Sequence, residues 1–453
     1  MGPVLASPSV TQEHLPARPP FALRARLVTP RAAGGTRHEP DGLLLVDAAG
    51  RLTFAGAAGD RPADAAKATD LRPWVVLPGM VDLHAHLPQL PNAGLGAGLD
   101  LLPWLDRYIF PVERGFDAAA AERLAPIVWR AFAAAGTTTA LVYGAVYEAS
   151  LDAAFQAAES HGIRAVIGKV MMDRLTYDPT IAAGTILERS LRESANLIAR
   201  WHGRDDGRLR YAVTPRFAIS CTAEMLRESA ALAASTGAYW QTHLSEDRGE
   251  IAEVSRLFPE ALDYVDVYDR AGGLGGRTIL AHAVHLSDRE LGRLVESGSH
   301  VAHCPASNLF LASGVMPLGR YLEAGLSVGL GSDVSAGPDL SIFTEMRVGF
   351  YAQNAMRVAG LSGGPSLGPL EWLRMGTLGG AEVLGLADQI GSLEVGKEAD
   401  LIALDPAFVA AVPGATDDDP EDLMSRLIFR SHPDMVRAAW VRGRRLEGPG
   451  RRG

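Results

Sequence analysis

His84 and His86 form an H-x-H pair at the end of an apolar stretch that a Pro-Gly turn divides. Residues two apart on a strand point to the same face, so we expect both imidazoles to face the same way. Two such imidazoles supply half of a zinc-type site, although an isolated H-x-H is more often a pair of polar residues at a strand end. Three later segments also end in candidate ligands: Gln241-Thr242-His243, Leu280-Ala281-His282 and Gly331-Ser332-Asp333.

These segments supply five candidate metal ligands: His84, His86, His243, His282 and Asp333. Imidazoles with a carboxylate favour Zn²⁺, with Fe²⁺ or Mn²⁺ as alternatives. Zinc lowers the pKa of a bound water molecule to about 7, which makes hydroxide available at neutral pH. We expect Asp333 to accept the proton of this water and Glu246 to protonate the substrate. Glu246 lies in a charged run, so a solvated surface carboxylate is the alternative interpretation of that residue.

The middle of the chain alternates apolar extended segments with helical ones. The strand that carries His84 is the first of eight expected strands, and the other seven are 138–143, 165–170, 209–214, 238–243, 278–282, 300–304 and 327–333. Helical segments lie between them, such as 117–135 before Gly136 and the helix that opens with the capping box Ser287–Glu290. Eight strand–helix units predict a (β/α)8 TIM-like barrel with its site at the carboxyl ends of the strands. All five candidate ligands fall at that rim.

The two ends of the chain have a different character from the middle. Short strands joined by turns occur at 21–56 and again at 399–443, which predicts a small accessory β-sandwich domain built from both ends. The expected organisation is a disordered tail and a barrel inserted into the accessory domain: tail 1–20, first accessory part 21–77, barrel 78–388 and second accessory part 389–448.

Composition excludes several classes of protein. The 453 residues are 47% hydrophobic and 21% charged, with a formal net charge of −10 and no basic patch, so nucleic acid is not an expected partner. No apolar run approaches the length of a membrane span, and the first twenty residues lack the pattern of a secretion signal. Only Cys221 and Cys304 occur, which fits a reducing compartment. We expect a cytoplasmic protein.

Several motifs resemble the amidohydrolase superfamily and, within it, the guanine deaminase family. The superfamily marks are the Pro78–Asp82 segment before H-x-H and the segment from Gly391 to Leu401. The narrower marks are Trp104-Leu105-Asp106-Arg107-Tyr108-Ile109-Phe110-Pro111-Val112-Glu113, Thr214-Pro215-Arg216-Phe217, Thr242-His243-Leu244-Ser245-Glu246 and His303-Cys304-Pro305-Ala306-Ser307-Asn308-Leu309.

This resemblance implies a metal-dependent aminohydrolase that converts guanine to xanthine and ammonia, with Glu246, His282 and Asp333 as its catalytic set. The implied metal ligands are His84, His86, His243 and Asp333, and His282 either joins them or hydrogen-bonds the metal-bound water. The implied purine contacts are Gln89, Arg216 and Phe217. A pterin, another aminopurine or a substituted triazine is the alternative substrate, and a homodimer is the implied assembly.

The number of metal ions depends on the fourth expected strand. In the binuclear barrels that this chain resembles, a bridging carboxylated Lys or a Glu lies at the end of the fourth strand. Here the fourth strand ends in Thr214-Pro215-Arg216-Phe217. Lys169 belongs to the third strand and is poorly placed as a bridge. We therefore expect one ion per chain.

Overall fold

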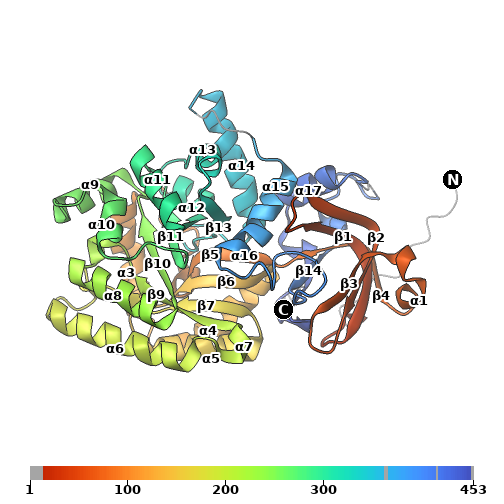
Figure 1. The fold of residues 1–453 in the computed structure, drawn as a ribbon, viewed down its shortest axis with the longest axis horizontal. Coiled ribbons are helices and arrows are strands. Elements are labelled where there is room, and N and C mark those ends of the chain that lie inside the picture. Colours follow the sequence, from red (N-terminus) through yellow and green to blue (C-terminus); the bar gives the residue numbers. More distant parts are fainter. Residues whose placement is uncertain (1–13, 362–365, 415–416, 450–453) are drawn as a thin grey trace.

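The computed structural model describes residues 14–361, 366–414 and 417–449. A parallel sheet curls into a barrel with helices around its outside, and a second sheet, red and blue in Figure 1, lies beside the barrel and combines both ends of the chain. The fold is the expected α/β class, a (β/α)8 barrel with an accessory β-domain.

The eight barrel strands occur in the predicted order, and every neighbouring pair is parallel. A short ninth strand, β8 (Val170–Met171), pairs with β9. The barrel strands are β5 (Met80–His86), β6 (Thr137–Tyr143), β7 (Arg164–Gly168), β9 (Leu209–Pro215), β10 (Tyr239–Leu244), β11 (Thr278–His282), β12 (His300–His303) and β13 (Ser327–Leu330).

The segment after β13 closes the barrel onto β5 through the main chain. The Asp333 amide donates to the His84 carbonyl at 2.7 Å, and the His86 amide donates to the Val334 carbonyl at 3.1 Å. Gly331 allows this approach, because a Cβ at that position would lie 2.7 Å from the Cβ of His84. Closure therefore brings Asp333 next to His84 and His86.

Helices cover the outside of the barrel and carry the caps expected from the sequence. The Asp117 side chain accepts from the Ala120 amide at the start of α4, and Ser287 and Glu290 form the capping box of α11. None of the helices in the described ranges has the length and apolar character needed to cross a membrane. The main barrel helices are α4 (Ala118–Ala134), α5 (Glu148–His161), α6 (Ala183–Trp201), α8 (Ala223–Thr236), α9 (Arg248–Leu257), α10 (Tyr264–Arg270), α11 (Asp288–Ser297), α12 (Pro305–Phe310), α13 (Leu318–Glu323), α14 (Ile342–Val358) and α15 (Pro369–Arg374).

Short helical turns fill the connections. They are η2 (Ala58–Asp60), α1 (Pro62–Ala65), η3 (Leu87–Asn92), α2 (Leu101–Trp104), η4 (Leu105–Ile109), α3 (Phe110–Arg114), α7 (Arg204–Gly207), η5 (Ala218–Ser220), η6 (Met375–Gly379), α16 (Gly380–Val383), η7 (Pro406–Phe408) and η8 (Pro433–Met435). The remaining helix of the C-terminal part is α17 (Pro420–Phe429).

The accessory sheet has seven strands in the order β16-β15-β14-β4-β1-β2-β3, so strands from the two chain ends meet at β4 and β14. Its strands are β1 (Phe21–Pro30), β2 (Thr36–Val46), β3 (Leu52–Ala57), β4 (Thr69–Pro78), β14 (Leu401–Leu404), β15 (Val436–Val441) and β16 (Arg444–Arg445). The expected limits of the four parts stay predictions.

The expected N-terminal tail falls partly outside the described residues, which begin at position 14. The rest of it packs on the accessory sheet: Leu15 is buried, and the Pro16 carbonyl accepts from the indole of Trp440 at 2.9 Å. The contact with Trp440 in β15 holds this segment against the C-terminal part of the chain.

A buried ion-pair cluster joins the barrel to the C-terminal part of the accessory domain. Arg164 in β7 donates to Glu398 at 2.5 Å and to Asp400 at 3.0 Å, and Arg442 also donates to Glu398 at 2.8 Å. Arg164 is almost fully inaccessible to solvent. A buried guanidinium requires such partners, since an unpaired buried charge is strongly unfavourable.

We predict that Arg164→Met lowers the free energy of unfolding by about 3–5 kcal/mol, because it leaves the buried Asp400 carboxylate without its cation, while Glu398 keeps Arg442 as a partner at this junction. Chemical denaturation followed by circular dichroism measures the loss. The control is Arg24→Met, which removes a surface ion pair with Asp41 and should leave the free energy of unfolding nearly unchanged. Equal losses in the two variants would contradict the role of the buried cluster.

Candidate active site

The H-x-H pair lies at the carboxyl end of β5, where both imidazoles are buried. The Asp333 carboxylate lies against them: Oδ1 is 3.1 Å from His84 Nε2 and 3.4 Å from His86 Nε2. The other oxygen, Oδ2, is 3.9 Å from His282 Nε2. One carboxylate therefore borders three of the candidate imidazoles.

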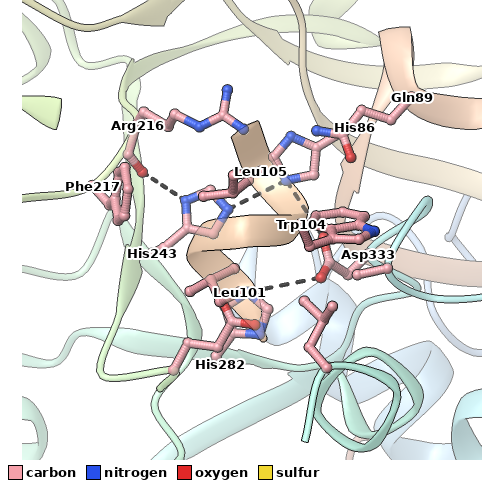
Figure 2. A pocket seen from close by; sticks show the side chains of 13 residues that line it. His86, Gln89, Leu101, Trp104, Leu105, Arg216, Phe217, His243, His282 and Asp333 are labelled. Carbon is pink, nitrogen blue, oxygen red and sulfur yellow. Dashed lines mark hydrogen bonds and ion pairs between the residues drawn. The ribbon is translucent and has the colours of Figure 1, made fainter. Parts of the chain in front are cut away.

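His243 and His282 reach the same space from β10 and β11 (Figure 2). His243 Nδ1 donates to the Arg216 carbonyl at 2.6 Å, and His282 Nδ1 donates to Asn308 Oδ1 at 2.9 Å. Because Nδ1 carries the proton in each ring, the Nε2 lone pair of each is left for a metal. His243 Nε2 lies 3.3 Å from His86 Nε2, as expected of nitrogens that share a ligand.

The donor set fits a metal ion by its chemistry. Nε2 of His84 and of His282 is buried and has no hydrogen-bond partner among the described residues. Such orphaned nitrogens are rare unless an unseen group satisfies them. Burial is the main cause that lowers the pKa of His84 to about 4, so this imidazole is neutral and able to bind a metal. Two groups of candidate ligands share His84, and within each group the ligand atoms all lie within 4.8 Å of one another. One group is His84, His243 and His282, and the other is His84, His86 and Asp333.

Glu246 is a buried side chain of this site, not a solvated one. Its Oε2 lies 3.5 Å from His282 Nε2, and its Oε1 accepts from the Ser313 hydroxyl at 3.2 Å. Burial and the nearby carboxylate of Asp333 raise the pKa of Glu246 well above its usual range. The protonated form, which can donate a proton, is thereby favoured.

A narrow pocket opens beside these groups, and the three expected purine contacts, Gln89, Arg216 and Phe217, all line it (Figure 2). Apolar side chains form another part of the pocket lining, here called the apolar wall. Part of that wall comes from α2 and the π-helical turn η4, which follow the first barrel strand. The apolar lining residues are Leu101, Trp104, Leu105, Phe217, Leu311 and Ala336.

Several supporting residues were not assigned a role from the sequence, although they lie inside or beside the motifs described above. Asn308 orients His282, and Ser307 donates to Asp333 Oδ2 at 2.5 Å. Asp82 accepts from the His84 and Ser332 amides at 3.1 and 3.0 Å. The sequence signal for these residues is their place in the motifs Pro78–Asp82 and His303–Leu309.

Several other polar residues near the barrel rim do not join the site. Lys169 points to Glu193, with 3.2 Å between Nζ and Oε2, and belongs to neither ligand group among the described residues. His285 bonds the Ser313 carbonyl at 2.7 Å, which fits a structural role. His303 is buried on β12, whose end supplies no ligand to the two groups.

Comparisons with known proteins agree with this geometry. A model of the Amidohydrolase family matches residues 75–446. A probable guanine deaminase of Deinococcus radiodurans is 39% identical, over 89% of this chain and 92% of its own length. The guanine deaminase of Escherichia coli strain K12 is 38% identical over 83% of each chain.

Solved structures give the same result. The E. coli guanine deaminase structure superposes with a TM-score of 0.86 at 33% identity, covering 94% of this chain and 99% of the other. The guanine deaminase of C. acetobutylicum, solved with bound guanine in the active site, also has a TM-score of 0.86, at 27% identity and the same coverage. The chain therefore belongs to the amidohydrolase family, and within it to the guanine deaminases.

Proposed function

We propose that this protein hydrolyses guanine to xanthine and ammonia. The observation that carries the proposal is the convergence of four imidazoles, Asp333 and Glu246 beside a pocket lined by Arg216 and Gln89. A metal-activated water, a proton donor and fixed polar groups for a flat heterocycle are what hydrolytic deamination requires. The guanine deaminases that this chain resembles support the choice of substrate.

One Zn²⁺ per chain is the proposed metal, because an imidazole-rich set with one carboxylate suits zinc better than iron or manganese. When bound, zinc acts as a Lewis acid and brings the pKa of a water molecule to about 7. His282 borders the same space and either binds the ion or hydrogen-bonds its water. The other proposed ligands are His84, His86, His243 and Asp333.

The purine is proposed to lie between Phe217 and the polar groups of Arg216 and Gln89. Guanine presents a carbonyl oxygen, ring nitrogens and a flat face. Arg216 offers permanently charged N–H donors for the carbonyl, and Gln89 offers both a donor and an acceptor. Phe217 supplies an apolar surface against the ring.

Both carboxyl groups move protons in the proposed reaction. The water oxygen bonds to the amino-bearing carbon while Asp333 accepts a proton from that water and Glu246 donates one to the adjacent ring nitrogen. The C–N bond then breaks as Asp333 gives its proton to the leaving amine, and the new hydroxyl group gives its proton to Glu246 and becomes the carbonyl of xanthine. One water is consumed, and one xanthine and one ammonia are formed. The homodimer and the cytoplasmic location stay predictions.

A substrate panel tests the reaction. Protein with its metal quantified is offered guanine, adenine, a pterin and an aminotriazine, and ammonia release is measured. We expect guanine to be preferred by orders of magnitude, because a site built to hydrogen-bond its substrate rejects analogues that lack the matching groups. Chelation should abolish the activity and added zinc restore it. Preference for another ring, or full activity after exhaustive chelation, would refute the proposal.

We predict that Glu246→Gln keeps its zinc but loses most of its turnover, because the amide retains the shape of the side chain and cannot donate the acid proton. The kcat on guanine and the metal content are measured together. Glu290→Gln changes a buried carboxyl in the capping box of α11 that does not line the pocket, and this matched control should keep its turnover. An active Glu246→Gln variant would exclude this residue as the proton donor.

We predict that Arg216→Ala lowers kcat/KM on guanine by roughly 10- to 150-fold, the value of one charge-assisted hydrogen bond, with metal content unchanged. Steady-state kinetics and metal analysis provide the measurement. Arg216→Lys keeps the positive charge but not the planar donor array, so it separates lost recognition from a lost charge. Unchanged activity in Arg216→Ala would place the purine elsewhere.

A further inference from the structure

Glu113 is a fully buried carboxylate that lies behind the pocket and does not line it. It belongs to α3, the turn that follows the π-helical turn η4. Its oxygens accept hydrogen bonds from side chains of three separate segments. Gln89 Nε2 donates to Oε1 at 2.6 Å, and the Tyr177 hydroxyl and Arg216 Nη1 both donate to Oε2.

Two of these donors, Gln89 and Arg216, are the proposed purine contacts. With its Nε2 bound to Glu113, the Gln89 amide has a fixed orientation, and its Oε1 lies 3.4 Å from both the amide and the hydroxyl of Ser335. The Arg216 guanidinium is held by the carboxylate and by the ring of Phe110, whose centroid is 5.3 Å away. Four of its five N–H groups are not used by Glu113.

The ion pair also sets the charge that a ligand meets. Burial alone would lower the pKa of Arg216, but Glu113 and its neighbours raise it above its ordinary value. Burial likewise opposes ionisation of Glu113, yet Arg216 leads the groups that lower its pKa. Both groups are therefore ionised, and their charges cancel. The pocket gains firmly held N–H donors without a net positive charge, which suits the carbonyl of a neutral ring.

We propose that Glu113 is a positioning residue that determines specificity: it holds Arg216 and Gln89 for the purine and neutralises the guanidinium, so that the pocket selects a neutral oxopurine over an anionic one. The inference rests on the proposed function, since it assigns Arg216 and Gln89 to the purine. Tyr177, from the loop after β8, completes the cluster by covering the second carboxylate oxygen.

A role in orienting the metal ligands is the competing explanation. Glu113 Oε1 lies 3.9 Å from His86 Nδ1, which is too long for a hydrogen bond. The contacts to Gln89, Tyr177 and Arg216 are much shorter, so the carboxylate is engaged on the purine side of the site. The zinc content of a Glu113 variant separates the two roles, because only a residue that orients the metal ligands should lower it when replaced.

The test is Glu113→Gln, which keeps the shape of the side chain and removes its charge. Steady-state kinetics on guanine are combined with inhibition by urate, an oxopurine that is a monoanion at neutral pH. We expect KM for guanine to rise about tenfold with kcat largely retained, and urate to inhibit about tenfold more strongly, because the guanidinium is no longer neutralised. Zinc content should stay at the wild-type level.

Two outcomes would overturn the proposal. If guanine and urate both bind unchanged, or both weaken equally, Glu113 does not set specificity. If zinc is lost, the carboxylate supports the metal ligands instead. Wild-type turnover of guanine is measured first, because its absence refutes the proposed function itself, whereas an active wild type with an unaltered variant refutes only the role of Glu113.

Matched variants separate a general loss of stability from a loss of specificity. Glu398→Gln breaks a buried Arg–Glu pair at the domain junction, so it should lower the melting temperature and leave KM and urate inhibition unchanged. Tyr177→Phe removes one hydrogen bond but keeps the charge, and should not strengthen urate binding.

Glu113→Asp covers the case in which Glu113→Gln does not fold. It keeps the charge but shortens the reach to the three donors. It should therefore raise KM for guanine without favouring urate. An unchanged KM in this variant would also overturn the proposal.

Discussion

The main-chain hydrogen bond from Asp333 to the His84 carbonyl, 2.7 Å long, closes the barrel and fixes the distance between two proposed metal ligands. The ligand geometry is thus set by the backbone before any ion binds. Asp333 has a φ of +47° and His282 a φ of +72°, values that L-residues adopt rarely and at a cost of about 1–3 kcal/mol each. The hydrogen bonds of barrel closure hold Asp333 in this conformation, which aims its carboxylate at the imidazoles.

Arg216 connects this metal-ligand set to the pocket. Its carbonyl fixes the ring of His243, while its side chain is held by Glu113 at the edge of the space proposed for the purine. Under the proposed function, this one residue directly after β9 supports the metal-ligand geometry with its carbonyl and purine recognition with its side chain. A shift of this strand end would disturb both functions together. The close packing of the barrel wall therefore keeps the metal ligands and the proposed purine contact in position.

The barrel and its rim could be predicted from the sequence because they depend on local patterns. Apolar segments that end in His or Asp identified the strands and the candidate ligands, and turn residues placed the helix ends. The role of Glu113 could not be found this way, since Gln89, Tyr177 and Arg216 meet it only in three dimensions. The π-helical turn η4 breaks the 3.6-residue period and was also invisible to pattern analysis. Contacts of the segment at Leu15 and Pro16 with the sheet likewise depend on strands near the other end of the chain.

The pairing of β4 with β14 has a consequence for biosynthesis. Strands β1 to β4 emerge from the ribosome early, whereas β14 emerges only after the whole barrel has been synthesised. During that interval the nascent chain presents the unpaired edge of β4, which can template pairing with another extended polypeptide. The edge of β4 therefore stays open to mispairing until β14 has been synthesised.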